Sequence, residues 1–131
     1  MKVLAGMILA CFLLAGCATQ TQELRITPYM AQSYTPSQMC LIYYRTQSPV
    51  IMEEIQRRGM FSESQRRLIR ESKVARFMSE DAVRCAWGEP DQINTTISAA
   101  GRTEQWVYHR CPTCKMQFIY FELGKVTAIQ S

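Results

Sequence analysis

Hydrophobic residues recur every three or four positions in the middle of the chain and form extended runs toward its C-terminus. Between residues 78 and 87 this spacing predicts a helix with one buried face, formed by Met78, Ala82, Val83, Ala86 and Trp87. Ser79 can cap the start of this helix, and Gly88 and Pro90 are expected to end it.

Two further helices are predicted before this one. The first covers residues 50–58 and ends at Gly59, because glycine suits the left-handed position after a helix. The second begins at Ser62, since Ser62 and Gln65 have the spacing of a capping box, and it continues to about Lys73. Its apolar stripe is narrow, so we expect one side to remain in contact with water.

Extended segments follow the helices, over residues 92–97, 103–110, 115–123 and 125–130. Turns are expected at residues 100–101 and at Gly124. Strands joined by such short connections can pair only antiparallel. We therefore expect an α+β fold of two layers, with N-terminal helices packed on a three- to four-stranded antiparallel meander sheet. This domain is expected to cover residues 39–131.

The N-terminus has the pattern of an export signal. Lys2 precedes an apolar run, residues 3–14, which is shorter than the roughly 20 residues that a membrane-spanning helix needs. Residues 14–17, Leu-Ala-Gly-Cys, resemble the cleavage site of bacterial lipoproteins. We therefore interpret residues 1–16 as a lipoprotein signal peptide and Cys17 as the lipidated residue that anchors the chain to a membrane. The alternative is an ordinary signal peptide followed by an unrelated cysteine.

Residues 17–38 are interpreted as a lipidated N-terminus and a flexible tether, because they are rich in Thr, Gln, Ser and Pro. Tyr29, Met30 and Tyr34 do not fit a pure linker, and they could pack on the domain or contact a neighbour. Ala18, where an aspartate would favour the inner membrane, indicates the outer membrane of a Gram-negative bacterium.

Composition and charge restrict the function further. The 131 residues suit one domain, and 15 Lys and Arg against 11 Asp and Glu leave a formal charge of +4. Residues 53–76 hold seven basic and four acidic residues, so the excess positive charge is concentrated there. This segment could bind anionic lipid or an acidic partner, or it could be an ordinary solvated face. Nucleic acid is not expected as a partner of an exported lipoprotein.

Four cysteines remain after Cys11 and Cys17 are set aside: Cys40, Cys85, Cys111 and Cys114. In an oxidising compartment they favour disulfides, with three possible connectivities. Cys111 and Cys114 lie between two predicted strands, where a bridge would close a small loop and leave Cys40 to pair with Cys85.

Two chemical hypotheses for the same cysteines, redox activity and zinc binding, compete with the interpretation as structural disulfides. A redox-active Cys-x-x-Cys pair normally precedes a helix, and a strand is predicted after Cys114. Zinc could be held by His109 together with cysteines, but a surface histidine on a strand explains His109 equally well. We therefore predict no metal site.

The sequence contains no catalytic motif that we recognise. It has neither a Gly-x-Ser-x-Gly turn nor a glycine-rich phosphate loop, and the adjacent Glu80 and Asp81 point to different sides of a helix. We therefore expect a protein that is not an enzyme and has no cofactor.

The C-terminal half resembles the SmpA/OmlA (BamE-like) family of small outer-membrane lipoproteins. The resemblance is carried in this order by Met78, Gly88, Pro90, Trp106, Tyr108 and Gly124, and the lipoprotein leader agrees with it. The chain departs from the family at Phe77, where glycine is usual, and over residues 91–93, so no partner-binding residue is transferred. The resemblance implies two helices packed on a three-stranded antiparallel sheet.

The resemblance also implies an accessory or scaffold that binds protein partners in cell-envelope maintenance or outer-membrane protein assembly, among them barrel-assembly components. We expect the partners to contact exposed aromatic residues of the sheet, such as Tyr108 or Tyr120. The alternative function is a periplasmic thiol-redox or zinc-binding protein that uses Cys111 and Cys114.

Overall fold

The computed structural model of the chain describes residues 25–131. The predicted signal peptide, the lipidation site at Cys17 and the first part of the tether lie outside the described residues. Within residues 25–131, no helix is both long enough and apolar enough to cross a membrane.

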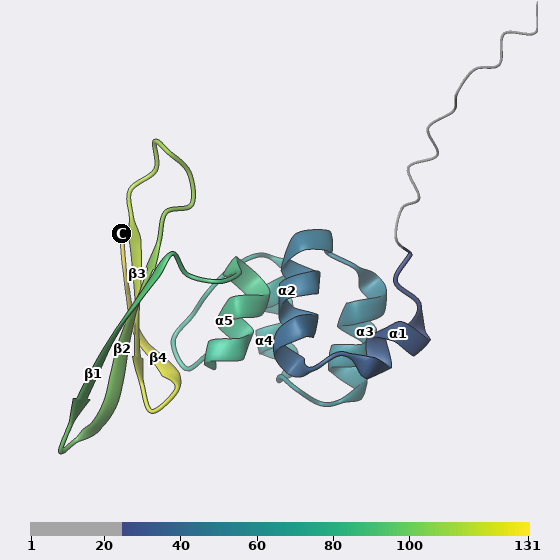
Figure 1. Cartoon of the computed structure of the whole chain (residues 1–131), viewed down its shortest axis with the longest axis horizontal. Helices are drawn as coiled ribbons and strands as arrows, with labels where there is room; N and C mark the ends of the chain where they lie inside the picture. Colours follow the sequence, from purple (N-terminus) through teal and green to yellow (C-terminus); the bar gives the residue numbers. More distant parts are fainter. Residues whose placement is uncertain (1–24) are drawn as a thin grey trace, which may run out of the picture.

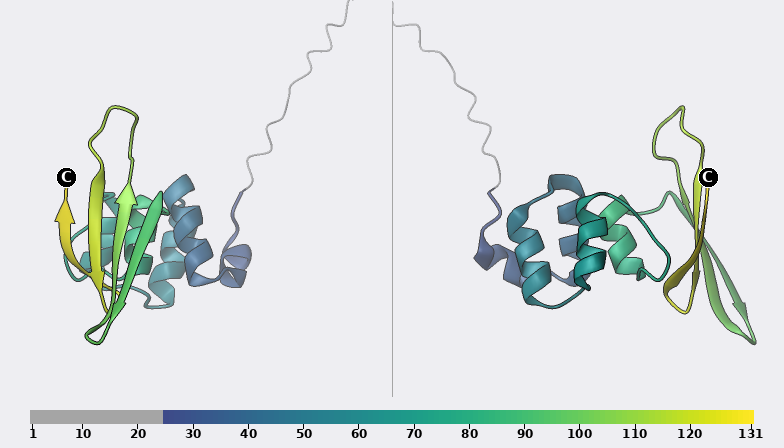
Figure 2. Two further views of the ribbon diagram at one scale, coloured as in Figure 1. Left: turned by 60° about the vertical axis from the view of Figure 1, so that its left-hand side comes forward. Right: turned by 180° about the vertical axis from the view of Figure 1, so that it is seen from behind.

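Across the described residues 25–131, five helices precede a four-stranded antiparallel sheet, which confirms the predicted α+β class (Figure 1). The elements are α1 (Pro28–Ser33), α2 (Pro36–Thr46), α3 (Pro49–Arg57), α4 (Glu63–Arg70), α5 (Glu80–Trp87), β1 (Gln92–Ser98), β2 (Gly101–Tyr108), β3 (Gln117–Glu122) and β4 (Lys125–Gln130). Of these five described helices, only α5 lies directly beside the sheet. The views in Figure 2 agree that the other helices are stacked behind α5 rather than spread over the sheet.

The first helices begin within the predicted tether, and this differs from the expectation of a flexible segment to residue 38. The side chain of Thr27 accepts a hydrogen bond from the backbone N–H of Met30, and Thr35 forms a reciprocal capping box with Gln38. A proline follows each of these caps, at the first helical position, where its missing N–H costs no hydrogen bond. Ala31 is fully buried, so this part of the chain belongs to the folded domain.

Arg58 attaches α1 to the rest of the domain. Its guanidinium donates hydrogen bonds to the backbone carbonyls of Ala31, Gln32 and Tyr34, which lie at the C-terminal end of α1. Glu54 accepts a 2.6 Å hydrogen bond from Arg58 and further bonds from Arg57. These hydrogen bonds and the two positive charges lower the pKa of the Glu54 carboxyl to about 2. The ion-paired cluster of Glu54, Arg57 and Arg58 therefore holds α1 against the domain, where the composition predicts a flexible tether.

The predicted start of α4 is confirmed, because the Ser62 hydroxyl accepts a hydrogen bond from the backbone N–H of Gln65. The helix ends at Arg70, one turn earlier than predicted, and Ser72 has a positive φ of 53°. The chain then reaches the sheet before α5 begins. Phe77 donates its backbone N–H to the carbonyl of Val126, and Val126 donates in return to the carbonyl of Met78.

The sheet is a meander in which each strand pairs with the next, in the order β1-β2-β3-β4. The inner face is apolar where α5 covers it, and Trp106, Ile119, Phe121 and Val126 are buried there. Trp106 and Phe121 are in ring contact, with centroids 4.4 Å apart. These side chains form one core with the buried residues of the helices.

The cysteines form the two predicted pairs. Cys40 and Cys85 are joined by a disulfide, which ties α2 to α5, and both residues are fully buried. Cys111 and Cys114 form the second disulfide, in the connection between β2 and β3. The first bridge spans 45 residues of sequence and the second spans three, so they constrain the unfolded chain very differently.

We predict that replacing Cys40 and Cys85 by alanine lowers the free energy of unfolding by about 4 kcal/mol through the entropy of the unfolded chain. The matched variant with Cys111 and Cys114 replaced by alanine should lose less than half as much, because its loop is short. Denaturant unfolding of both variants beside the parent measures this difference. Equal losses in the two variants would contradict the assigned role of the Cys40–Cys85 bridge.

Candidate functional site

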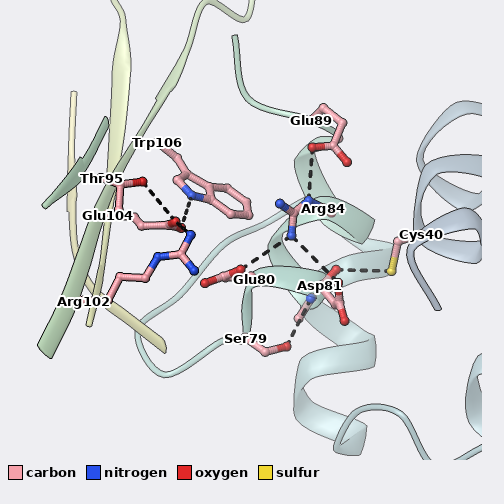
Figure 3. Close-up of polar contacts among 12 residues, drawn as sticks. Cys40, Ser79, Glu80, Asp81, Arg84, Glu89, Thr95, Arg102, Glu104 and Trp106 are labelled. Carbon is pink, nitrogen blue, oxygen red and sulfur yellow. Dashed lines mark hydrogen bonds and ion pairs between the residues drawn. The ribbon is translucent and has the colours of Figure 1, made fainter. Parts of the chain in front are cut away.

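The side chain of Arg84 joins α5 to the inner face of the sheet (Figure 3). Its guanidinium lies over the ring of Trp106, 4.4 Å from the centroid, which is a favourable cation–π distance. The same guanidinium is 3.1 Å from Glu89 and within 4 Å of Glu80 and Asp81. Arg84 therefore links a neutral aromatic core to a cluster of three carboxylates.

Glu104 is a nearly fully buried carboxylate on the inner face of β2. It accepts hydrogen bonds from the indole N–H of Trp106 at 2.9 Å and from the hydroxyl of Thr95, and it is ion-paired with Arg102. Burial alone would raise the pKa of the Glu104 carboxyl. The hydrogen bonds from Trp106, Arg102 and Thr95 and the charge of Arg102 outweigh burial, so the pKa lies below its ordinary value.

The residues on which the predicted SmpA/OmlA resemblance is based lie at this junction between α5 and the sheet. They are Met78 and Gly88 at the two ends of α5, Pro90 in the connection to β1, Trp106 and Tyr108 on β2, and Gly124 in the turn between β3 and β4. Met78, Trp106 and Tyr108 are buried. Their positions explain the motif as a means of docking one helix on a sheet, which is a structural role.

Gly88 is the residue on which the end of α5 depends. Its φ of 80° and ψ of −165° belong to a region that essentially only glycine adopts. A Cβ atom at this position would lie 2.6 Å from Cε1 of Tyr44, on α2. The carbonyl of Gly88 accepts a 3.0 Å hydrogen bond from the hydroxyl of Tyr108, whose ring packs edge-on against Trp87.

The structure corrects the predicted contact surface at Tyr108. This residue is buried under α5, so a partner that binds the surface of the sheet cannot reach it. The same burial raises the pKa of its hydroxyl. Tyr120 lies on the outer face of the sheet and is half-buried. Its hydroxyl accepts a hydrogen bond from Gln105 and donates one to Gln130. Asn94 donates to Gln105 from β1, so polar side chains are connected across all four strands.

The connection between β2 and β3 carries the second disulfide at the surface. Cys114 is exposed, Cys111 is half-buried, and the backbone N–H of Cys114 donates to the carbonyl of Cys111. The next regular element after Cys114 is β3, so no helix dipole acts on its sulfur. The geometry of this pair is that of a structural loop closure.

His109 does not join the cysteines in a metal site. Its backbone N–H donates to the carboxylate of Asp91 at 2.6 Å, and its ring Nδ1 lies 3.8 Å from the same carboxylate. Over residues 25–131, no group of three or more His, Cys, Asp or Glu side chains is arranged to hold a metal ion.

Some of the basic residues of the segment 53–76 form ion pairs with acidic residues of the same segment. Arg57 and Arg58 are paired with Glu54, and Lys73 is paired with Glu71. Arg67 and Arg70 line a surface depression on α4 together with Glu63 and Ser64. Binding of anionic lipid by this segment stays a prediction.

Sequence analysis missed Glu104 and its partners. The available signal was an acidic residue that alternates with the large aromatic residues Trp106 and Tyr108 and so lies on the same face of the predicted strand. An acid at such a position indicates either an error of register or a buried, paired carboxylate.

Comparison with known proteins identified no relative of this chain. No family model matches it, and no match was found among the curated proteins or the solved structures. The similarity to SmpA/OmlA lipoproteins therefore stays a prediction from the motif residues.

We predict that Gly88→Ala lowers the free energy of unfolding by more than Gly59→Ala. Gly59 also has a positive φ, of 63°, but no atom lies within 4 Å of an added Cβ. Gly59→Ala should therefore cost about 1–2 kcal/mol of backbone strain, whereas Gly88→Ala adds a collision with Tyr44. Thermal and denaturant unfolding measure both variants. Adding Tyr44→Ala to Gly88→Ala should recover the collision part, and equal losses at the two glycines would contradict this packing.

We predict that Glu104→Gln destabilises the protein at pH 7 by about 1.5–3 kcal/mol, because charged hydrogen bonds are lost. The folded-state pKa of Glu104 is depressed, so its contribution is complete above the ordinary value of 4.5 and disappears as the pH falls through the folded-state pKa. The stability difference between parent and variant should therefore shrink below pH 4.5. Glu122→Gln, at an exposed carboxylate, serves as the control. A difference that does not change with pH would contradict the assignment.

Proposed function

We propose that the protein is a lipid-anchored outer-membrane lipoprotein facing the periplasm, which acts without catalysis as an accessory or scaffold in envelope maintenance or outer-membrane protein assembly. The observation that carries the proposal is the Leu-Ala-Gly-Cys sequence at residues 14–17, ahead of a domain closed by two disulfides. Such a leader supplies export and an anchor, and disulfides persist in the compartment to which it leads.

The number of residues between the proposed anchor and the domain is compatible with this arrangement. Cys17 precedes the start of α1 at Pro28 by eleven positions in the sequence. A segment of this length would hold the domain close to the bilayer, at roughly 20 Å if it behaves as a coil. The basic residues of α4, among them Arg67 and Arg70, would then be within reach of anionic headgroups.

The resemblance to SmpA/OmlA lipoproteins supports a role in binding protein partners. The motif residues explain how the helix and sheet are joined, and they leave the outer face of the sheet open for contacts. Exposed or half-buried residues of that face, such as Asn94, Gln105 and Tyr120, are the side chains that a partner would meet.

A second candidate is a periplasmic thiol-redox protein that uses Cys111 and Cys114, and the exposure of Cys114 is the observation in its favour. Thiol trapping under non-reducing conditions distinguishes the two functions. A structural bridge should stay oxidised in mild reductant, whereas a redox-active pair should exchange and accumulate in the reduced form.

We predict that the full-length chain produced in a Gram-negative host incorporates labelled palmitate, and that Cys17→Ala abolishes the incorporation. Cys11→Ala is the matched control, because Cys11 lies in the predicted signal peptide and should leave labelling unchanged. Labelling that survives Cys17→Ala, or is absent from the parent, would contradict the proposed anchor. Crosslinking of the lipidated protein in envelopes then reports whether barrel-assembly components are recovered with it.

A further inference from the structure

The two edges of the sheet differ in how they are protected against pairing with another strand. At one edge, β4 carries Lys125, and its pairing with β3 shifts register between Tyr120 and Phe121. Charges and bulges at an edge hinder the addition of a further strand. At the other edge, β1 has the sequence Gln-Ile-Asn-Thr-Thr-Ile-Ser, without a charge, a proline or a register shift. The β1 edge therefore lacks these devices.

The hydrogen-bonding side of β1 can be derived from the register of its neighbours. Leu123 donates its backbone N–H to the carbonyl of Arg102, and these two residues continue the β2–β3 register by one position beyond the pair Thr103–Glu122. Even-numbered residues of β2 thus bond toward β3, and odd-numbered ones bond toward β1. The odd residues of β2 are opposite even residues of β1. The N–H and C=O groups of Ile93, Thr95 and Ile97 therefore point to the open edge.

These three residues are accessible and share the inner face of the sheet. All seven residues of β1 are exposed, and Ile97 retains 81% of its accessible surface. Figure 1 shows that the hairpin of β1 and β2 extends away from the helices, so the end of the strand is not covered by the described chain. The open edge of β1 thus presents two isoleucine side chains on one face, together with the free backbone N–H and C=O groups of three residues.

The two isoleucines of β1 lie symmetrically about Thr95, and the remaining residues of the strand are all polar and uncharged. When two copies of the strand are paired antiparallel with Thr95 opposite Thr95, Ile93 lies opposite Ile97, and Asn94 lies opposite Thr96. This register brings the same three residues into hydrogen-bonded pairs, which gives six backbone hydrogen bonds between the copies. It also places isoleucine on isoleucine, with no charge opposite a like charge.

We propose that the β1 edge binds the β1 edge of a second copy of this chain, in antiparallel register centred on Thr95, to form a continuous eight-stranded sheet. The helices of both copies lie on the same side of that sheet. Pairing over seven residues buries less than the 1,200 Å² or so of a standard interface, so the association is weak and reversible in solution. The inference concerns the oligomer and does not depend on the proposed lipid anchor.

Cysteine crosslinking of the full-length chain in intact cells tests the pairing and its register, wherever in the cell the chain is found. Thr95→Cys should give a disulfide-linked dimer on mild oxidation, because hydrogen-bonded residues opposite each other have Cα atoms about 5.5 Å apart. Thr96→Cys is the matched control, one residue away and on the other face. In the proposed register the Cα atoms of residue 96 in the two copies are more than about 7 Å apart. The yield of disulfide-linked dimer from Thr96→Cys should therefore stay at the background of the parent chain.

Differently tagged copies carrying Ile93→Cys and Ile97→Cys should crosslink when they are produced together, and neither should crosslink when produced alone. Adding Thr95→Lys to both copies places two ammonium groups opposite each other and should reduce this mixed product to background. The Tm of the Ile93, Thr96 and Ile97 variants should stay at that of the parent, since these residues are exposed and the backbone bonds of β1 to β2 are kept. The Thr95 variants lose the hydrogen bond from the Thr95 hydroxyl to Glu104 and should melt below the parent, so their crosslinking is measured at a temperature where they are folded.

Three results would overturn the proposal. They are no crosslinking of Thr95→Cys in a folded variant, equal crosslinking of Thr95→Cys and Thr96→Cys, and crosslinking of Thr95→Cys to a different protein in place of a second copy. The palmitate experiment on Cys17 reports separately on the anchor, so failure of either inference is distinguishable from failure of the other.

Discussion

The position of α5 is the constraint on which the rest of the structure depends. One side of this helix is bonded to α2 through the Cys40–Cys85 disulfide, and the other side packs on the sheet through Arg84 over Trp106. The hydrogen bond from Tyr108 to the carbonyl of Gly88 fixes its C-terminal end. Helices and sheet therefore share one core, although only α5 lies directly beside the strands.

Sequence patterns predicted the elements whose signals are local. The stripe from Met78 to Trp87 and the Ser79 cap located α5, and short connections led to the observed meander. The patterns failed where a distant group decides the outcome. The polar composition before residue 38 indicates a linker, yet Arg58, more than twenty residues away, binds the end of α1 and orders it. No local pattern reports such a contact.

In the candidate site, too, the features with local sequence signals were predicted, and those that depend on contacts between distant residues were not. The spacing of the cysteines, together with the oxidising compartment that the leader predicts, favoured the observed pairs, and the residues that carry the predicted resemblance were named as a group. The sequence did not predict which of these residues are buried and which lie on the surface. Tyr108 and Tyr120 look alike in the sequence, but the register places Tyr108 under α5 and Tyr120 on the outer face. The buried carboxylate of Glu104 was missed, because its partners Arg102, Thr95 and Trp106 converge only after two strands pair.

The disulfide between Cys40 and Cys85 connects the fold to the proposed function, because it holds α5 in place and persists only where thiols are oxidised. Mass spectrometry of the protein isolated from cells, with free thiols alkylated before lysis, tests this connection most directly. The account predicts Cys40 linked to Cys85 and Cys111 linked to Cys114, with all four unalkylated. Alkylated Cys40 and Cys85 in a folded protein would contradict both the role of the bridge and the compartment proposed for the chain.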